Sequence, residues 1–205
     1  FTIDTTAPTL AQVTVVTTPT NDNTSSYTFS STEAGTISYS ICGGNLDNAS
    51  ADNNTITFDA LADGNYSDCK ISVTDNASNT SDNLSVSSFT IDTIIPVLAQ
   101  VTAVTNPTND NTSSYTFSST KAGDITYGGS CSSSTTTATT NNNTVTFIAL
   151  GEGTYSNCSV KVTDNATNES NTLTVSSFRV DTTAPALTQV TAVTSPTMVS
   201  GTISN

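Results

Sequence analysis

The sequence predicts an all-β protein made of tandem β-sandwiches, with essentially no helix. The chain repeats itself at steps of 88 and 89 residues, and residues 1–30 match residues 89–118 at 25 of 30 positions. Short stretches of alternating apolar residues are separated every 8–15 residues by Gly, Asn, Asp or Pro, a spacing typical of a sandwich. No stretch shows a 3.6-residue apolar period of useful length, so helices are not expected.

Each complete repeat is expected to hold about seven strands, and each strand carries apolar side chains at alternate positions on one face. In chain order the expected strands of the first repeat are Leu10 to Val16 after Pro8, the stretch around Tyr27 and Phe29, Ile37 to Ile41 after the Ala34-Gly35 turn, the stretch around Ile56 and Phe58, Cys69 to Val73 after the Asp63-Gly64 turn, and Leu84 to Ile91. The last of these changes phase between Val86 and Phe89, which predicts a β-bulge near Ser87-Ser88.

The repeat length also sets the expected domain boundaries. A period this long is the size of one small domain and exceeds the units of solenoids and propellers. We expect residues 1–4 to end a preceding repeat, residues 5–92 and 93–181 to form two complete repeats, and residues 182–205 to begin a third. Residues 182–205 cannot bury their own apolar side chains, so we expect them to be ordered by contacts outside the two complete repeats. The partner would be a further repeat or a strand-accepting neighbouring chain.

Four cysteines divide evenly between the repeats. Cys42 and Cys69 are 27 residues apart, and so are Cys131 and Cys158. Zinc sites use closely spaced ligand pairs and often His, which this chain lacks, so one disulfide per repeat is the favoured interpretation and two buried thiols the alternative. Disulfides imply an oxidising, extracellular location. Cys42 lies one place off the phase of its strand, so we expect it just beyond the strand end.

Composition excludes several functions. Four Lys or Arg stand against 17 Asp or Glu, giving a formal charge of −13, which disfavours nucleic acid and anionic membranes. No apolar run is long enough to span a bilayer, so no membrane insertion is expected in this segment. Without His, a Ser/His/Asp or Cys/His catalytic arrangement is impossible, and we expect no enzyme and no catalytic residues.

Three motifs resemble those of the tandem immunoglobulin-like repeats of giant bacterial surface proteins and adhesins. They are the Asp-Thr-Thr-Ala-Pro linker, the Leu61-Ala62-Asp63-Gly64-Asn65-Tyr66 turn and the Val73-Thr74-Asp75-Asn76-Ala77-Ser78-Asn79 segment, each with a counterpart in the second repeat. The resemblance implies immunoglobulin-like sandwiches in which Tyr66 forms a tyrosine corner. Many such repeats have Gly where Ser78 and Thr167 stand.

The resemblance also implies calcium at the junctions between repeats, where it stiffens the rod. The matching positions are the linker acids and the residues at the end of the penultimate strand: Asp4, Asp92, Asp181, Asp75, Asp164, Asn76 and Asn165. Calcium prefers such carboxylate and amide oxygens, and we favour Asp92 and Asp164 as ligands. The alternative is that these Asp side chains only cap turns.

Arrays of this kind usually extend or space something. We therefore expect a structural stalk or fibre segment of a large secreted or cell-surface protein of bacterial origin, whose partners are neighbouring repeats or identical chains. The alternatives are an adhesive module that binds a glycan or a host protein, and a subunit of a self-assembling extracellular filament or sheath. Aromatic residues on loops would favour an adhesive module, but Tyr and Phe fall mostly on core-facing strand positions.

Overall fold

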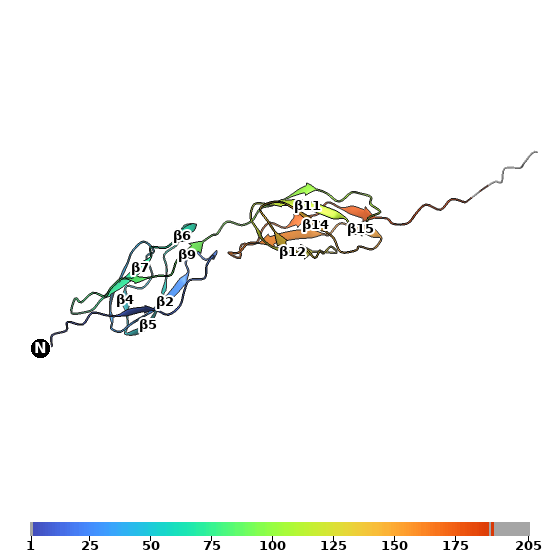
Figure 1. Ribbon diagram of the computed structural model, residues 1–205. Coiled ribbons are helices and arrows are strands. Elements are labelled where there is room, and N and C mark those ends of the chain that lie inside the picture. Colours follow the sequence, from blue (N-terminus) through green and yellow to red (C-terminus); the bar gives the residue numbers. More distant parts are fainter. Residues whose placement is uncertain (1, 189, 191–205) are drawn as a thin grey trace, which may run out of the picture.

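The computed structural model describes residues 2–188 and 190, and these contain strands but no helix (Figure 1). The strands of the first repeat are β1 (Leu10–Gln12), β2 (Ser26–Ser31), β3 (Gly35–Tyr39), β4 (Asn48–Ala49), β5 (Asp52–Thr57), β6 (Gly64–Tyr66), β7 (Lys70–Thr74), β8 (Leu84–Ser85) and β9 (Phe89–Ile91). Those of the second are β10 (Leu98–Thr102), β11 (Ser114–Ser119), β12 (Gly123–Gly128), β13 (Thr137–Ala138), β14 (Asn141–Thr146), β15 (Gly153–Tyr155), β16 (Ser159–Thr163), β17 (Leu173–Thr174) and β18 (Phe178–Val180). The predicted all-β class is confirmed.

Both repeats are built from the same three small sheets. In the first repeat the strand orders are β1-β2-β5, β4-β3-β7-β8 and β6-β9. The second repeats them as β10-β11-β14, β13-β12-β16-β17 and β15-β18. Every ladder between these strands is antiparallel, as expected where short loops join successive strands.

Each repeat encloses its own apolar core. Alternate side chains of β2, β5 and β7 point inward as the sequence predicted, and Tyr27, Phe29, Ile56 and Val73 are fully buried. A stack of four rings crosses this core from Tyr27 through Phe58 and Phe89 to Tyr66, with centroids 6.0, 5.6 and 5.4 Å apart. The second core holds the same stack, from Tyr115 through Phe147 and Phe178 to Tyr155.

The structure corrects the last predicted strand. Leu84 to Ile91 is not one bulged strand but two strands in different sheets, since β8 pairs with β7 and β9 pairs with β6. The chain crosses between sheets at Ser87-Ser88, so that Val86 and Phe89, although out of phase, both reach the core. The change of phase was therefore real, but it marks a change of sheet.

Two further predicted strands are shorter than expected. The amides of Val13 and Thr14 both donate to the carbonyl oxygen of Thr28, which ends β1 at Gln12 well before Val16. Ile41 lies beyond β3, and 63% of its surface is exposed.

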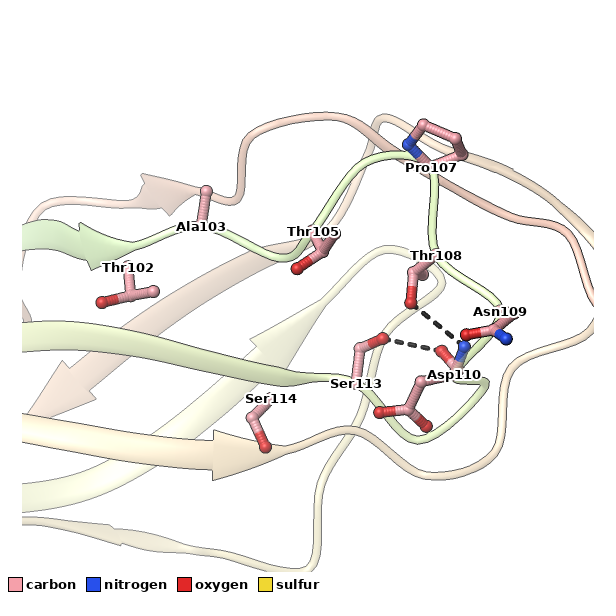
Figure 2. Close-up of a pocket in the computed structure, with 9 residues that line it drawn as sticks. All are labelled: Thr102, Ala103, Thr105, Pro107, Thr108, Asn109, Asp110, Ser113 and Ser114. Carbon is pink, nitrogen blue, oxygen red and sulfur yellow. Dashed lines mark hydrogen bonds between the residues drawn. The ribbon is translucent and has the colours of Figure 1, made fainter.

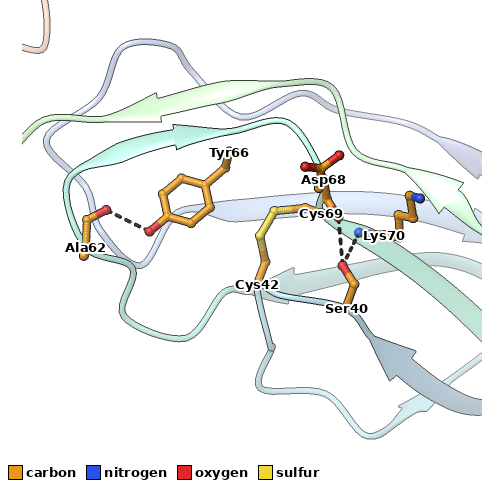
Figure 3. The surroundings of a disulfide bond; sticks show 7 residues. All are labelled: Ser40, Cys42, Ala62, Tyr66, Asp68, Cys69 and Lys70. Carbon is orange, nitrogen blue, oxygen red and sulfur yellow. Dashed lines mark hydrogen bonds between the residues drawn. A yellow bond between two sulfur atoms is a disulfide. The ribbon is translucent and has the colours of Figure 1, made fainter.

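The predicted disulfides Cys42–Cys69 and Cys131–Cys158 are both present, with Cα atoms 5.6 and 5.2 Å apart. Cys42 follows the end of β3, as predicted, and Figure 3 shows it facing Cys69 just before β7. The Tyr66 hydroxyl nearby donates to the carbonyl oxygen of Ala62 at 2.9 Å, and Tyr155 makes the same contact with Gly151. The bond expected of a tyrosine corner is thus formed in both repeats. Disulfides of this kind are typical of proteins that fold in an oxidising environment.

No helix in the described part of the chain is long and apolar enough to cross a bilayer.

Candidate metal centre at the repeat junctions

Asp92 is the residue that joins the two repeats. Its amide donates to the carbonyl oxygen of Thr20 in the first repeat at 2.9 Å, beside β9. Its own carbonyl oxygen accepts a 2.7 Å hydrogen bond from the Asn168 side chain of the second repeat. Asp4 stands at the equivalent position before the first repeat, where Asn79 donates to its carbonyl oxygen at 3.2 Å. One linker residue is therefore bonded directly to both repeats.

The loop after β7, and its counterpart after β16, presents a buried Asp to this linker. Asp75 Oδ1 accepts the amides of Ala77 and Asn79 at 2.8 Å, and Asn79 Nδ2 donates to Oδ2. In the second repeat Asp164 Oδ1 accepts the amides of Ala166 and Asn168 at 3.0 and 2.9 Å. Both aspartates thus cap their loops, as the turn-capping alternative expected.

These hydrogen bonds set the pKa of both aspartates. The Asn79 side chain, aided by loop amides, holds the pKa of Asp75 below its ordinary value despite burial. Burial acts to raise the pKa of Asp164, but the hydrogen bonds from Asn168 and Lys121 outweigh it and the pKa lies below its usual range. Both groups therefore carry a negative charge at neutral pH.

The linker acid, the loop acid and one residue from the turn before β3 or β12 form a cluster at each junction. Asp4, Glu33 and Asp75 make up the first junction cluster, and one carboxylate oxygen from each lies within 4.8 Å of the others. Two oxygens bound to one Ca²⁺ at 2.3–2.6 Å can be at most about 5 Å apart, so the spacing fits a calcium ion. Carboxylates have about four acceptor sites each, which leaves Asp75 able to bind an ion as well as its loop amides.

The middle junction cluster consists of Asp92, Lys121 and Asp164. Lys121 Nζ lies 2.5 Å from Asp92 Oδ1 and 3.0 Å from Asp164 Oδ2, and it also donates to the carbonyl oxygen of Ile94. Burial acts to lower the pKa of Lys121, but the two carboxylates outweigh it and raise the pKa above its usual value. An ammonium group therefore lies between the two aspartates that the sequence favoured for calcium.

A hollow opens beside each cluster. The first, of about 480 Å³, is lined by all three residues of the first junction cluster and by Asn76. The second, of about 350 Å³, is lined by the middle junction cluster, Asn165 and also Pro19 from the first repeat. Asn76 and Asn165 line these hollows and are exposed.

Asp181, the third linker acid, begins the same pattern. Its amide donates to the carbonyl oxygen of Thr108, and its carboxylate lies 3.3 Å from the Arg179 guanidinium. Glu152 binds the following linker residues Thr182 and Thr183, whose hydroxyl groups hold the pKa of Glu152 below its ordinary value. The remainder of the predicted third repeat, residues 189 and 191–205, lies outside the described residues.

Sequence reasoning missed Glu33, Lys121, Asn79 and Asn168. Glu33 and Lys121 come from a turn about 30 residues away from the linker, so no local motif connects them with it. A signal was nevertheless available. When the repeats are aligned position by position, this is the one place where an acidic residue of the first repeat is replaced by a basic residue in the second.

Another hollow lies away from the junctions and has different chemistry. It measures about 610 Å³ and is lined mostly by hydroxyl groups and amides around Thr108 and Asp110 (Figure 2). Asp110 Oδ1 already accepts the amide and hydroxyl of Thr112 at 2.8 and 2.9 Å. In Figure 2 the Asp110 backbone also bonds Thr108 and Ser113. This side chain is thus a turn former, as Asp22 is in the first repeat.

A scan of models of known protein families finds none that matches this chain. No curated protein matches its sequence either.

Proposed function

We propose that this chain is a stretch of stalk or fibre in a large secreted or cell-surface repeat protein, where tandem immunoglobulin-like sandwiches supply reach and stiffness. The observation that carries the proposal is the double attachment of Asp92. Its backbone bonds Thr20 of the first repeat and Asn168 of the second, and its carboxylate binds Lys121. A linker bonded on both sides within one residue resists bending better than a free one.

The arrangement of the repeats supports this proposal. Figure 1 shows them end to end, joined by a single short linker. The two multi-stranded sheets around each core, the disulfides and the tyrosine hydroxyl bonds agree with an immunoglobulin-like sandwich.

We further propose that calcium stiffens the junction at the first junction cluster. Three carboxylates at a spacing that suits the ion, with Asn76 at the edge of the hollow, support this assignment. The proposal does not extend to Asp92 and Asp164, because the Lys121 ammonium takes the place of an ion between them.

An adhesive role has less support in the described residues. Every Tyr, and every Phe from Phe29 onward, is buried or half-buried, so no exposed aromatic side chain is available there to stack on a sugar. A filament subunit stays an alternative. Leu98 begins β10 and is buried, whereas its counterpart Leu187 is 97% exposed, and a further repeat or a neighbouring chain would each cover it.

Small-angle scattering of the purified chain tests the stalk. We expect a narrow distribution of lengths that corresponds to two repeats end to end, with little compaction. The double variant Asp92→Ala, Asn168→Ala should broaden that distribution without unfolding either core. Matched profiles for the two proteins, or a compact wild type, would contradict a stiff junction. Electron micrographs of the same sample distinguish single rods from filaments.

A further inference from the structure

One position changes sign between two otherwise equivalent clusters. Glu33 and Lys121 each follow a Thr and precede an Ala-Gly turn, and each lies beside the hollow of its own junction. The linker Asp, the loop Asp and the loop Asn are the same in both repeats. The first junction cluster therefore carries three negative charges, and the middle junction cluster carries one net negative charge.

In the middle junction cluster the oxygens of the two aspartates bind a cation, the Lys121 ammonium group. An ammonium group can donate three hydrogen bonds, and Lys121 Nζ has three acceptors: Asp92 Oδ1, Asp164 Oδ2 and the Ile94 carbonyl oxygen. Two of these acceptors come from the linker and one from the second repeat. The cation therefore ties linker to repeat, and the same two aspartate positions hold a positive charge in this very chain.

The first junction cluster has the same two aspartate positions and no ammonium group among its three residues. Three carboxylates this close repel one another, and a positive charge between them would remove that repulsion. Asp75 is buried, and within the described residues its carboxylate accepts only neutral donors, namely two loop amides and the Asn79 side chain. Glu33 adds a third negative charge at the position where Lys121 adds a positive charge in the middle junction cluster.

We infer that this position selects the cation of each junction: Glu33 recruits a divalent ion to the first junction cluster, whereas Lys121 replaces that ion in the middle one. The inference rests on the proposed calcium site and adds which residue determines whether a junction binds calcium. The ion is a hard divalent cation that takes oxygen ligands, and Ca²⁺ is the expected choice because it accepts irregular carboxylate geometry more readily than Mg²⁺. The middle junction cluster then binds its linker to the repeat through Lys121 without a metal ion, whereas the first junction cluster requires calcium for the equivalent contact.

Isothermal titration of CaCl₂ into the chelator-treated full chain tests this rule by stoichiometry. We expect one site in the wild type, with a Kd on the order of 0.1–1 mM as in extracellular calcium modules. Glu33→Lys should abolish binding, and Lys121→Glu should raise the stoichiometry to two sites. Glu33→Gln and Lys121→Gln are the matched neutral controls. The first should weaken binding, and the second should create at most a weaker second site because it adds no third carboxylate.

Circular dichroism of each variant confirms that both cores remain folded, and the double exchange Glu33→Lys, Lys121→Glu provides a further check. That variant should again bind one ion, now at the middle junction cluster. Two sites in the wild type, or calcium binding that persists in Glu33→Lys, would overturn the inference. No site in the wild type would remove the calcium proposal as well, yet it would leave the stalk, which scattering tests separately. Equal heats for MgCl₂ and CaCl₂ would contradict the choice of ion.

Discussion

The first and middle junction clusters use the same loop and the same aspartates, but their formal charges differ by two units. The shared residues all have a second task in the backbone. Asp75 and Asp164 cap their loops, and Asn79 and Asn168 hold the linker carbonyl. Glu33 and Lys121 sit on a turn and reach the cluster with their side chains alone. The backbone of this position bonds Ser31 or Ser119 in the same way in both repeats, and only its side chain differs. Repeats can therefore alter how they are joined without altering how they fold.

The largest expected effect concerns the separateness of the two cores. Replacing Cys42 and Cys69 by Ala should lower the free energy of unfolding of the first repeat by roughly 3–4 kcal/mol, from the lost restriction of a loop of this length. Replacing Cys131 and Cys158 should do the same to the second. Calorimetry of each variant should show one transition shifted down and one unchanged. If both transitions moved together, the repeats would not be independent folding units.

A smaller effect separates the two loop aspartates. Asp164→Ala should destabilise the second repeat by about 2 kcal/mol, because two loop amides and Asn168 lose their acceptor. Asp75→Ala should cost the first repeat less, since no ammonium group loses a partner there. Urea unfolding of each variant, followed repeat by repeat in the disulfide-deleted background, measures the difference. Equal losses would mean that Lys121 adds nothing to the second loop.

The dependence of stability on pH gives a second test of the same comparison. The pKa values of Asp75 and Asp164 are lowered in the folded state, so their contribution to stability is complete above the unfolded value of about 4. It is lost as the pH falls through the lower folded values. The raised pKa of Lys121 places the loss of its contribution above about pH 10.4. The middle junction should therefore keep its ion pair across the whole range between, and the stability of Asp164→Ala should vary less with pH below about 4.

The limits of sequence reasoning follow from the same residues. Alternation placed Tyr27, Phe29, Ile56 and Val73 in the core correctly, because inward-facing strand positions have period two. Equal spacing paired the cysteines correctly. The change of sheet between β8 and β9 could not be predicted from the sequence. The apolar pattern shifts by one residue whether a strand has a bulge or the chain passes to another sheet. Glu33 and Lys121 reach their clusters only through tertiary contacts, and a single linear motif contains neither.

The two buried core tyrosines should respond in opposite directions to loss of their hydroxyl. Tyr27 donates to Gln12 at 3.3 Å, whereas Tyr115 has no hydrogen-bond partner for its buried hydroxyl within the described residues. Tyr27→Phe should cost about 1 kcal/mol, and Tyr115→Phe should gain about as much. Denaturant midpoints decide the sign. A loss in both variants would indicate a bridging water at Tyr115.

The smallest expected effect concerns the loop that positions both clusters. Ser78 and Thr167 have φ of 70° and 68°, left-handed values that favour Gly. The loop keeps its shape because the amide of each still bonds the carbonyl oxygen of the loop Asp, at 3.2 and 3.0 Å. Thr167→Gly should stabilise the second repeat by about 0.5–1 kcal/mol, the relief of strain exceeding the added freedom of the unfolded chain. Ser78→Gly should gain less, because Ser is not β-branched. Ala at either position keeps the strain and serves as the control. If the Ala variants were stabilised as much as the Gly variants, the gain in stability would come from loss of the hydroxyl group. Backbone strain would then not explain a difference between the two loops.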